Sequence, residues 1–291
     1  MKVSVLGLGN MGQPIADRLL DAGHDVAVWN RTASVAEPLR ERGATVLDDP
    51  GGAWDHGDAA IVMLANDAAV EAVLDGEDGL LQRGGTGRTV IDMSTISVDG
   101  SARLEERAAK AGTAFLRAPV SGTPGVVKAG NLTIVISGPR DAYDAAEAVL
   151  RDVGPNHFYV GSGEQARVVK LALNLMIAGT AQLMSEALVM AERNDIERAT
   201  MLEVMGGSAV GSPFVKYKTD ALVANNYAST FTARGLYKDL ALALRCANSV
   251  DVPLPVTTVV QQLVQGCIAQ GMGEMDFMAL LPRLRREAGL T

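Results

Sequence analysis

Two polar side chains that could do acid/base and hydrogen-bond chemistry lie within a long apolar stretch of the sequence. Lys170 and Asn174 are four residues apart, so a helix would place both on one face. A lysine buried among Val169, Leu171 and Leu173 would lose hydration, which would lower its pKa as an acid/base role requires. The alternative is an ordinary lysine that extends to solvent from the first turns of the helix. On this stretch alone, the second interpretation is favoured.

A glycine-rich motif near the N-terminus predicts a dinucleotide site. Gly7, Gly9 and Gly12 have G-x-G-x-x-G spacing directly after the apolar run 3–6, and Pro14 falls in the first turn of the helix that follows. In this context the first glycine permits the tight turn, the second lets backbone amides approach a pyrophosphate, and the third lets helix and strand pack closely. The free backbone amides and the helix dipole at the start of this helix favour a bound phosphate. A purely structural turn is the alternative.

The end of the second predicted strand, 25–29, bears on the choice of cofactor. An NAD-specific site would place an acidic residue here, whereas this chain has Asn30, Arg31 and Thr32. A guanidinium can pair with a ribose 2′-phosphate, and a carboxylate would repel it. The residues therefore favour NADP over NAD. If Arg31 instead stacks on the adenine, both cofactors remain usable.

Two further polar loops follow predicted strands, at the edge where open α/β sheets bind ligands. Hydroxyls at 94–97 follow the strand predicted over 89–93, and one of them can also cap the next helix. The loop 119–125 offers backbone N–H groups and the hydroxyl of Ser121 to an anion, although it could equally be a plain turn. His157 has no acid/base partner nearby in the sequence and is interpreted as structural.

The elements that must position these residues divide the chain into two different halves. Alternating strands and helices over residues 1–163 predict a Rossmann-type α/β domain that binds the dinucleotide. Residues 164–194 predict one interdomain helix of about 30 residues, roughly 45 Å long, which is apolar on nearly every face and is therefore expected to be buried. Residues 195–291 have only helical signals and predict an all-α domain.

Composition and charge exclude several classes of protein. The 291 residues are 48% hydrophobic and 21% charged, which is typical of a soluble globular protein with one large or two ordinary domains. A net charge of −8 argues against a nucleic-acid partner. Cys246 and Cys267 are too few for a disulfide framework or a metal cluster, so no metal site is predicted. Polar residues in the long helix argue against a membrane span, and the N-terminal residues do not resemble a signal peptide, so a cytoplasmic location is expected.

Four motifs, in order and spanning nearly the full length, resemble those of the β-hydroxyacid dehydrogenases. This family contains 3-hydroxyisobutyrate dehydrogenase, tartronate semialdehyde reductase and the glyoxylate/succinic semialdehyde reductases. The motifs are residues 7–12 for the cofactor, 118–122 with Gly125 and 130–132 for the substrate, 161–174 for catalysis, and 238–240 for cofactor contact from the helical domain. One of them would be weak evidence, whereas four with the proper spacing are strong.

The resemblance implies a role for each matching residue. Lys170 would be the acid/base residue, and Asn174 would bind the substrate beside it. The substrate-binding residues would be Ser121, Gly122, Thr123, Phe231 and Asp239. The cofactor-binding residues would be Gly7, Leu8, Gly9, Asn10, Met11, Gly12, Asn30, Arg31, Thr32, Leu64, Ala65, Thr95 and Lys238. The helical domain would contribute to the substrate site and would form a homodimer or homotetramer.

Four positions depart from the family pattern. Thr123 stands where a second glycine is usual, and Leu173 replaces the first of a usual asparagine pair. Ala65 stands where a proline is common after the strand predicted over 59–64, and Arg117 replaces a common acidic residue. Thr123 and Leu173 border the substrate, so the resemblance leaves the identity of the substrate open while it implies the reaction type.

The predicted function is an NADP-dependent interconversion of a small 3-hydroxy acid, or another short hydroxy acid, and its semialdehyde or aldehyde acid. NAD remains a possible cofactor, and the predicted partner is a small substrate that bears a carboxylate. Two alternatives stay open. Imine reductases share this architecture but typically replace the lysine, so Lys170 counts against them. A dinucleotide-binding module without catalysis would have no use for a buried amine.

Overall fold

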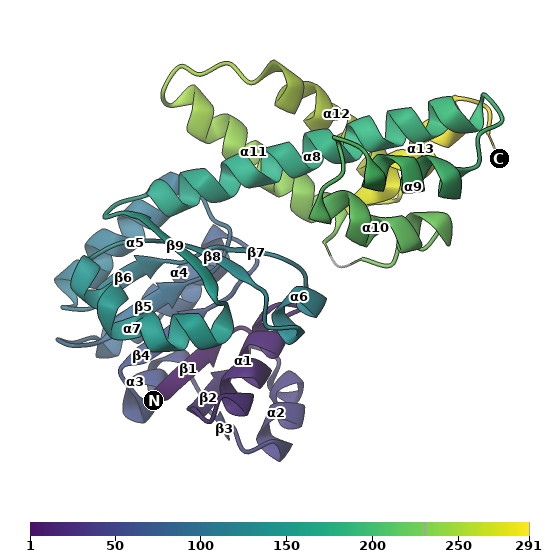
Figure 1. The fold of residues 1–291 in the computed structure, drawn as a ribbon. Coiled ribbons are helices and arrows are strands. Elements are labelled where there is room, and N and C mark those ends of the chain that lie inside the picture. The colour runs from purple at the N-terminus through teal and green to yellow at the C-terminus, as the bar shows by residue number, and fades with distance from the viewer. Residues whose placement is uncertain (230, 291) are drawn as a thin grey trace. The chain divides into compact units, whose positions relative to one another are not determined.

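The computed structural model describes residues 1–229 and 231–290, and the chain forms two compact units, Met1–Lys170 and Leu171–Thr291 (Figure 1). The first unit is built on one sheet with helices around it, and the second is helical. The predicted fold class, a Rossmann-type domain followed by an all-α domain, is therefore confirmed. The division between the units falls inside the helix predicted over 164–194.

The sheet of the first unit has the strand order β3-β2-β1-β4-β5-β6-β8-β7, with β9 paired to β8. From β3 to β6 all pairs are parallel, while β8 runs antiparallel to β6 and β7. The strands are β1 (Lys2–Leu6), β2 (Asp25–Trp29), β3 (Thr45–Val46), β4 (Ala59–Val62), β5 (Thr89–Asp92), β6 (Ala114–Arg117), β7 (Val120–Ser121), β8 (Thr133–Ser137) and β9 (Asn156–Gly161). The chain order reverses between β1 and β4, which is the kind of switch point at which doubly wound sheets bind ligands.

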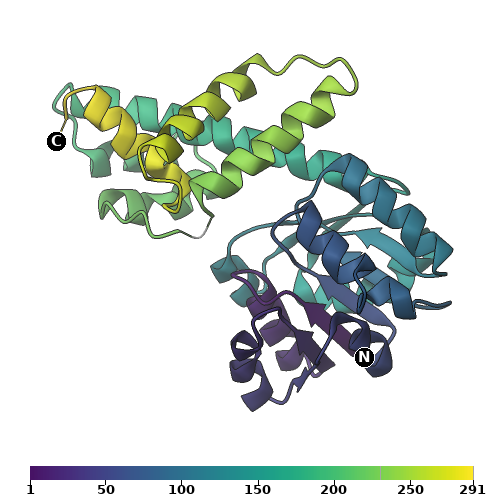
Figure 2. The same ribbon diagram turned by 180° about the vertical axis from the view of Figure 1, so that it is seen from behind.

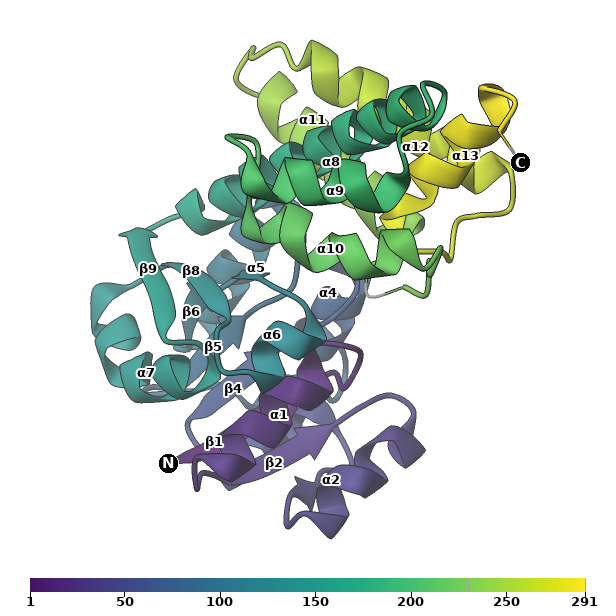
Figure 3. The same cartoon turned by 45° about the vertical axis from the view of Figure 1, so that its right-hand side comes forward.

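Helices cover both faces of this sheet, because successive side chains of each strand point to opposite sides. Val3 and Val5 belong to the apolar layer under α1, α2, α6 and α7, the side that faces the viewer in Figure 3. Leu6 belongs to the opposite layer, under α3, α4 and α5. The helices are α1 (Gly12–Asp21), α2 (Glu37–Glu41), α3 (Ala53–His56), α4 (Asp67–Asp75), α5 (Val98–Lys110), α6 (Pro124–Lys128) and α7 (Arg140–Val153). The buried parallel strands require this double cover.

The predicted strands agree with the structure to within about two residues at their ends. The strand predicted over 25–29 is β2, whereas the strand predicted to end at Leu64 ends at Val62. The shorter strand has a local cause. The amide of Leu64 donates to the hydroxyl of Ser94 at 2.9 Å instead of to a neighbouring strand, so the chain leaves the sheet early.

The second unit is a bundle of helices around its own apolar core. Its helices after α8 are α9 (Arg198–Gly207), α10 (Pro213–Val223), α11 (Ala233–Asn248), α12 (Pro255–Ala269) and α13 (Leu280–Glu287), with one 3₁₀ turn at Phe277–Ala279. Leu236 and Leu240 of α11 pack in this core with Val260 and Val264 of α12, and Figure 2 shows this helix pair in lime green. The core is independent of the sheet layers of the first unit.

The long helix α8 spans Gln165–Glu192 and continues from the first unit into the second. Ala178, Ala181 and Leu188 are buried in the helical core. The expectation that every face is buried is wrong, because Met176, Leu183 and Met190 are 65%, 66% and 65% exposed. Their seven-residue spacing places them on one stripe of the helix. The helix is apolar all round because it has a second apolar face that stays outside the core.

Among the described residues, α8 is the one helix whose length and composition would allow it to cross a membrane. Its buried side nevertheless contains Asn174, Gln182 and Ser185, and each makes a hydrogen bond within the protein. A helix with satisfied polar side chains on its buried side is typical of a protein core.

Candidate active site

The glycine-rich loop turns the chain from β1 directly into α1, and two of its glycines are sterically required. Gly7 has a φ of 98°, and a Cβ there would lie 2.4 Å from the carbonyl oxygen of Met63. A Cβ on Gly12 would lie 1.9 Å from the carbonyl oxygen of Gly7. Gly7 therefore permits the turn and Gly12 permits close packing of helix and loop, as the motif predicts.

The space above this loop fits a phosphate group. Gly9 is exposed, and a Cβ there would meet no atom within 4 Å. Helix α1 has no side-chain cap at Met11, whereas Asn66, Ser97 and Thr123 cap α4, α5 and α6. Its first turn also lacks an acidic residue. Open backbone next to an uncapped helix start suits a pyrophosphate, so these residues fit the predicted dinucleotide.

The turn after β2 is tied to the glycine-rich loop by Asn30. Its Oδ1 accepts a hydrogen bond from the Leu8 amide at 3.0 Å, and its Nδ2 donates to the Thr32 carbonyl at 3.1 Å. Arg31 and Thr32 are exposed beside it. The structure thus brings these predicted cofactor residues together at the carboxyl ends of β1 and β2.

The predicted cofactor residues after β4 and β5 also adjoin each other. Ser94 accepts a hydrogen bond from the Leu64 amide, which joins the two loops. Leu64 and Thr95 are half-buried, and Ala65 is exposed. The hydroxyl of Ser97 caps α5, which is the capping role that the sequence allowed for one hydroxyl of this loop.

The loop predicted to bind a carboxylate lies at the short strand β7. Ser121 is half-buried and pairs with β8. Gly122 has a φ of 149°, and a Cβ there would lie 2.9 Å from a methyl carbon of Leu132, so this position requires glycine. Thr123 accepts a hydrogen bond from the Val126 amide at 3.4 Å. The hydroxyl that departs from the family pattern therefore has a local structural role as the cap of α6.

The helix that carries Lys170 begins at the carboxyl end of the same sheet. Ser137 of β8 pairs with Arg117 at the carboxyl end of β6, donates to the Gly163 carbonyl at 2.6 Å and accepts from the Ala166 amide at 3.2 Å. Lys170 follows one turn later and is half-buried. The first turns of α8 thus start from the sheet edge that holds the glycine-rich loop and the Ser121 loop.

In the second unit, three predicted residues are joined directly. Asn174 Nδ2 donates to Asp239 Oδ2 at 2.6 Å, and Lys238 Nζ lies 3.1 Å from Asp239 Oδ1. Asn174 and Asp239 are 3% and 2% exposed, so both are held inside the unit. The carboxylate fixes the orientation of the Asn174 amide, because it uses one N–H and leaves the other N–H and Oδ1 for a different partner.

The ring of Phe231 is fixed by aromatic packing and by a glycine. It makes an edge-to-face contact with Phe277 at 5.8 Å between centroids, and Phe277 stacks on Phe214 at 6.0 Å. A Cβ on Gly235 would lie 2.7 Å from the Phe231 ring, so the first turn of α11 needs glycine to admit the ring.

Four charged residues near these elements had no predicted role. Arg167 is fully buried and pairs with Asp92, while Glu164 pairs with the fully buried Arg117. Arg117 is the residue that departs from the acidic family pattern, and its contacts show what the arginine does here. A signal was present, since an arginine at the end of a buried strand or in an apolar helical turn requires an acidic partner. Sequence alone does not identify that partner.

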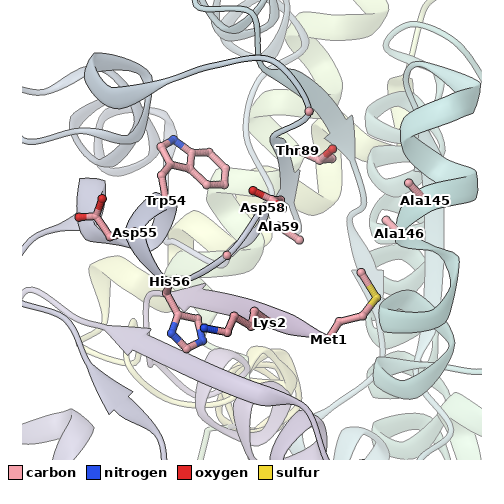
Figure 4. A pocket seen from close by; sticks show the side chains of 12 residues that line it. Met1, Lys2, Trp54, Asp55, His56, Asp58, Ala59, Thr89, Ala145 and Ala146 are labelled. Atoms are coloured by element: carbon pink, nitrogen blue, oxygen red, sulfur yellow. The ribbon is translucent and has the colours of Figure 1, made fainter.

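A separate pocket of about 480 Å³ lies at the opposite edge of the sheet, where β1, β4 and β5 begin (Figure 4). Its lining includes Met1, Lys2, Trp54, His56 and Asp58. None of the predicted site residues lines it. Ligands of open α/β sheets bind at the carboxyl ends of the strands, so this pocket is no candidate for the cofactor site.

Comparisons with known proteins agree with this arrangement. Residues 2–161 match the family model for the NAD binding domain of 6-phosphogluconate dehydrogenase, and residues 163–284 match that for the NAD-binding domain of NADP-dependent 3-hydroxyisobutyrate dehydrogenase. An uncharacterised oxidoreductase of Bacillus subtilis is 36% identical over 283 residues, which cover 97% of this chain and 99% of that protein. The 3-hydroxyisobutyrate dehydrogenase of Pseudomonas aeruginosa is 35% identical over 272 residues, 90% of each chain. The solved structure of Psf3 in complex with NADP+ and 2-OPP is 25% identical, has a TM-score of 0.90 and covers 97% of this chain and 99% of that one.

The fold and the glycine-rich site define a nicotinamide-dependent oxidoreductase. The two family models together cover nearly the whole chain, and the sequence motifs agree with them. The chain belongs to the β-hydroxyacid dehydrogenase family, whose members oxidise hydroxy acids or reduce the corresponding carbonyl acids.

Proposed function

We propose that this protein catalyses the reversible, NADP-linked interconversion of a small 3-hydroxy acid, or another short hydroxy acid, and its semialdehyde or aldehyde acid. Lys170 is the general acid/base in this proposal. The observation that carries it is that Lys170 and Asn174 occupy consecutive turns of α8, at the end of the helix that starts from the ligand-binding edge of the sheet. Membership of the family supports the reaction class.

In the reductive direction, Lys170 donates a proton to the carbonyl oxygen as negative charge develops on it. In the oxidative direction the neutral amine accepts the hydroxyl proton. The ammonium charge also stabilises the developing alkoxide, most strongly where water is excluded. The nicotinamide, when bound, supplies or accepts the hydride. The half-buried position of Lys170 supports this role, because an acid/base group must be shielded and still reach a ligand.

Asn174, Ser121 and Gly122 orient the substrate. Asp239 holds the Asn174 amide, which leaves one N–H and Oδ1 to bind the hydroxyl or carbonyl oxygen. The Ser121 hydroxyl and the Gly122 amide bind the carboxylate, away from the reacting carbon. An orientation fixed in this way makes hydride transfer effectively unimolecular.

NADP is the proposed cofactor, because Asn30, Arg31 and Thr32 include no carboxylate that would repel a 2′-phosphate. The two hydrogen bonds of Asn30 bring the exposed Arg31 next to the glycine-rich loop. A guanidinium at this place can bind the 2′-phosphate through two nitrogens.

A substrate screen tests the proposed function. Glyoxylate, succinic semialdehyde, methylmalonate semialdehyde and a cyclic imine are each assayed with NADPH and with NADH, and NADPH binding is measured separately by fluorescence. We expect turnover of at least one aldehyde acid. Turnover of the imine alone would replace the proposal with an imine reductase. Tight NADPH binding without any turnover would identify a binding module.

We also propose that the protein is a homo-oligomer whose subunits pair through the exposed face of α8. Met176 and Leu183 project from this face on either side of Gly179, and a Cβ on Gly179 would meet no atom within 4 Å. Ala172 and Ala187 flank the two large residues. In each direction from Gly179, this face has first a large apolar side chain and then an alanine.

A two-fold interface requires such a self-complementary face. In an antiparallel pair of α8 helices that cross near Gly179, Met176 lies beside Leu183 of the partner subunit, and the small residues allow close approach of the backbones. The seven-residue spacing to Met190 continues the contact by the geometry of helix pairs that wind around each other.

A further inference from the structure

We infer that the buried ion pair of Arg167 and Asp92 positions the first turn of α8, and through it Lys170, so that the pair sets the rate of turnover without touching substrate or cofactor. This inference rests on the proposed role of Lys170. It deepens that proposal, because it names residues that act on the acid/base group through the backbone of its helix.

Arg167 lies one turn before Lys170, and each of its three guanidinium nitrogens makes a contact within the first unit. Nη2 pairs with Asp92 Oδ2, Nη1 donates to the Ser94 carbonyl at 2.6 Å, and Nε donates to Ser101 Oγ at 3.2 Å. Arg167 is 1% exposed and Asp92 is 0% exposed. Three directional contacts from a planar, rigid group determine both the position and the rotation of this helical turn.

Asp92, the other member of the ion pair, lies at the start of a predicted cofactor loop. Asp92 is the last residue of β5, and its Oδ1 accepts from the Ser94 amide at 3.0 Å. Ser94 Oγ in turn accepts from the Leu64 amide at 2.9 Å. Thr95, the next residue, is predicted to lie beside the nicotinamide. One connected set of hydrogen bonds thus joins the cofactor loops to the helix that carries Lys170.

A second buried arginine, Arg117, contacts Glu164, the residue directly before α8. Arg117, the last residue of β6, donates to Glu164 Oε1 at 2.8 Å and to Glu105 through two nitrogens at 2.9 Å and 2.5 Å. Arg117 directly precedes the loop that leads to Ser121. The start of α8 is therefore anchored to β5 by Arg167, to β6 by Arg117 and to β8 by Ser137.

Stability alone is a poor reason for such a pair. Desolvation of two charges opposes their attraction, and apolar side chains of similar size often stabilise a fold as well or better. What apolar side chains do not supply is a fixed orientation, since they lack directional contacts. Misplacing a catalytic group by about 1 Å can reduce the rate by about a hundredfold, so this ion pair has its effect through the orientation of Lys170.

Four variants separate positioning from stability. Arg167→Met and Asp92→Asn each leave one member of the pair alone, and both are expected to lower the melting temperature. The double variant Arg167→Met/Asp92→Asn removes both charges, so its melting temperature should return toward that of the wild type. Its kcat should nevertheless stay about tenfold to a hundredfold low, with the KM for NADPH within about threefold of the wild type. Arg167→Lys keeps the positive charge but lacks the planar set of guanidinium donors, and should have an intermediate kcat.

The matched control lies at the other end of the same helix. Glu192 is 12% exposed and pairs with Arg198 at 2.6 Å and with Arg285 at 2.7 Å, so Glu192→Gln/Arg198→Met also removes ion pairs that α8 makes. This control should change kcat by less than about twofold. Recovery of kcat together with the melting temperature in the Arg167→Met/Asp92→Asn variant would overturn the inference, because the pair would then have only a structural role.

Hydrogen exchange gives a readout that does not depend on turnover. Amides of residues 168–171 should exchange at least about tenfold faster in Arg167→Met/Asp92→Asn than in the wild type, while amides near residue 188 should not change. Unchanged exchange at 168–171 would overturn the inference even if turnover fell. If the wild type turned over no substrate, the proposed function would fail, and the exchange experiment would still decide whether the ion pair anchors the helix.

Discussion

The Asn174 amide donates a 2.6 Å hydrogen bond to the buried carboxylate of Asp239, a residue 65 positions further along the chain. The two residues belong to different sequence motifs, Asn174 to the one predicted for catalysis and Asp239 to the one predicted for cofactor contact. The contact shows that they form one hydrogen-bonded cluster with Lys238, whose Nζ lies 3.1 Å from the same carboxylate. The orientation of Asn174 therefore depends on Asp239.

Asp239→Asn should impair substrate binding more than cofactor binding. The substitution removes a charge-assisted hydrogen bond worth about 1.5–3 kcal/mol, which corresponds to about a tenfold to hundredfold loss in kcat/KM for the hydroxy acid. Steady-state kinetics with each substrate varied in turn measure the effect. Asp220→Asn, at an exposed position of α10, is the control and should leave kcat/KM unchanged. A loss of equal size in both variants would argue against the role of Asp239.

Lys170→Ala should abolish most turnover while it leaves NADPH binding nearly intact. General acid/base catalysis contributes about 10²–10⁴-fold, so kcat should fall within that range. Single-turnover kinetics measure the chemical step, and fluorescence titration measures NADPH affinity. Lys110→Ala, at an exposed position near the end of α5, is the control. Near-normal turnover by Lys170→Ala would remove the lysine from the mechanism.

The local structure around the candidate site could be predicted from the sequence where its cause is local. Gly7 and Gly12 are required by contacts with the turn that they themselves form, so their spacing carries the information. The carboxyl ends of β1, β2, β4 and β5 follow from strand alternation, and the predicted loops lie there. Arg167 and Asp92 could not be paired in this way, because they are 75 positions apart and no spacing rule links them.

The exposed face of α8 was mispredicted for a related reason. Periodicity identifies which side chains of a helix are apolar, but an apolar residue inside a core and one on a second face have the same pattern. Met176 and Leu183 therefore look like core residues in the sequence, and only the packing shows that they are exposed. Thr123 is similar, since its capping role depends on where α6 begins.

Arg31→Ala should weaken NADPH binding more than NADH binding. The two cofactors differ only in the 2′-phosphate, so loss of a guanidinium that binds this group should raise the Kd for NADPH by about tenfold or more and leave that for NADH within about twofold. Titration with each cofactor measures both constants. Arg40→Ala is the control, because Arg40 is exposed and pairs with Glu37 on α2. Equal losses for the two cofactors would contradict the 2′-phosphate assignment.

Glu105→Gln should destabilise the protein at neutral pH and much less in acid. Hydrogen bonds from Arg117 hold the pKa of the Glu105 carboxyl below its ordinary value of 4.5, while partial burial opposes them. A carboxyl whose pKa is lower in the folded state stabilises the fold above its unfolded-state pKa. That stabilisation is lost as the pH falls through the folded-state pKa.

The gap in free energy of unfolding between the wild type and Glu105→Gln should therefore be largest near pH 7 and should close as the pH falls below the ordinary carboxyl pKa of 4.5. Urea denaturation at several pH values measures this gap. Glu106→Gln, at the exposed neighbouring position on α5, is the control. A gap for Glu105→Gln that stays constant with pH would show that Arg117 does not hold the charged form of Glu105.

Met176→Glu and Leu183→Glu should each convert the oligomer into monomers. The two residues are 65% and 66% exposed on one stripe of α8, and an antiparallel pairing would bury both against the same residues of the partner subunit. A carboxylate in such an apolar contact is desolvated, and in a two-fold interface each substitution introduces two like charges. Light scattering coupled to size-exclusion chromatography measures the mass of the species in solution.

Val250→Glu is the matched control, because Val250 is 66% exposed but lies after α11 and outside this stripe. It should leave the oligomer intact. Gly179→Leu tests the same face without adding a charge. A leucine side chain would occupy the open space and keep the two helix backbones apart, so this variant should also be monomeric. If Met176→Glu, Leu183→Glu and Gly179→Leu all kept the mass of the wild-type oligomer, the subunits would have to pair through another surface. The exposed apolar face of α8 would then have no part in assembly.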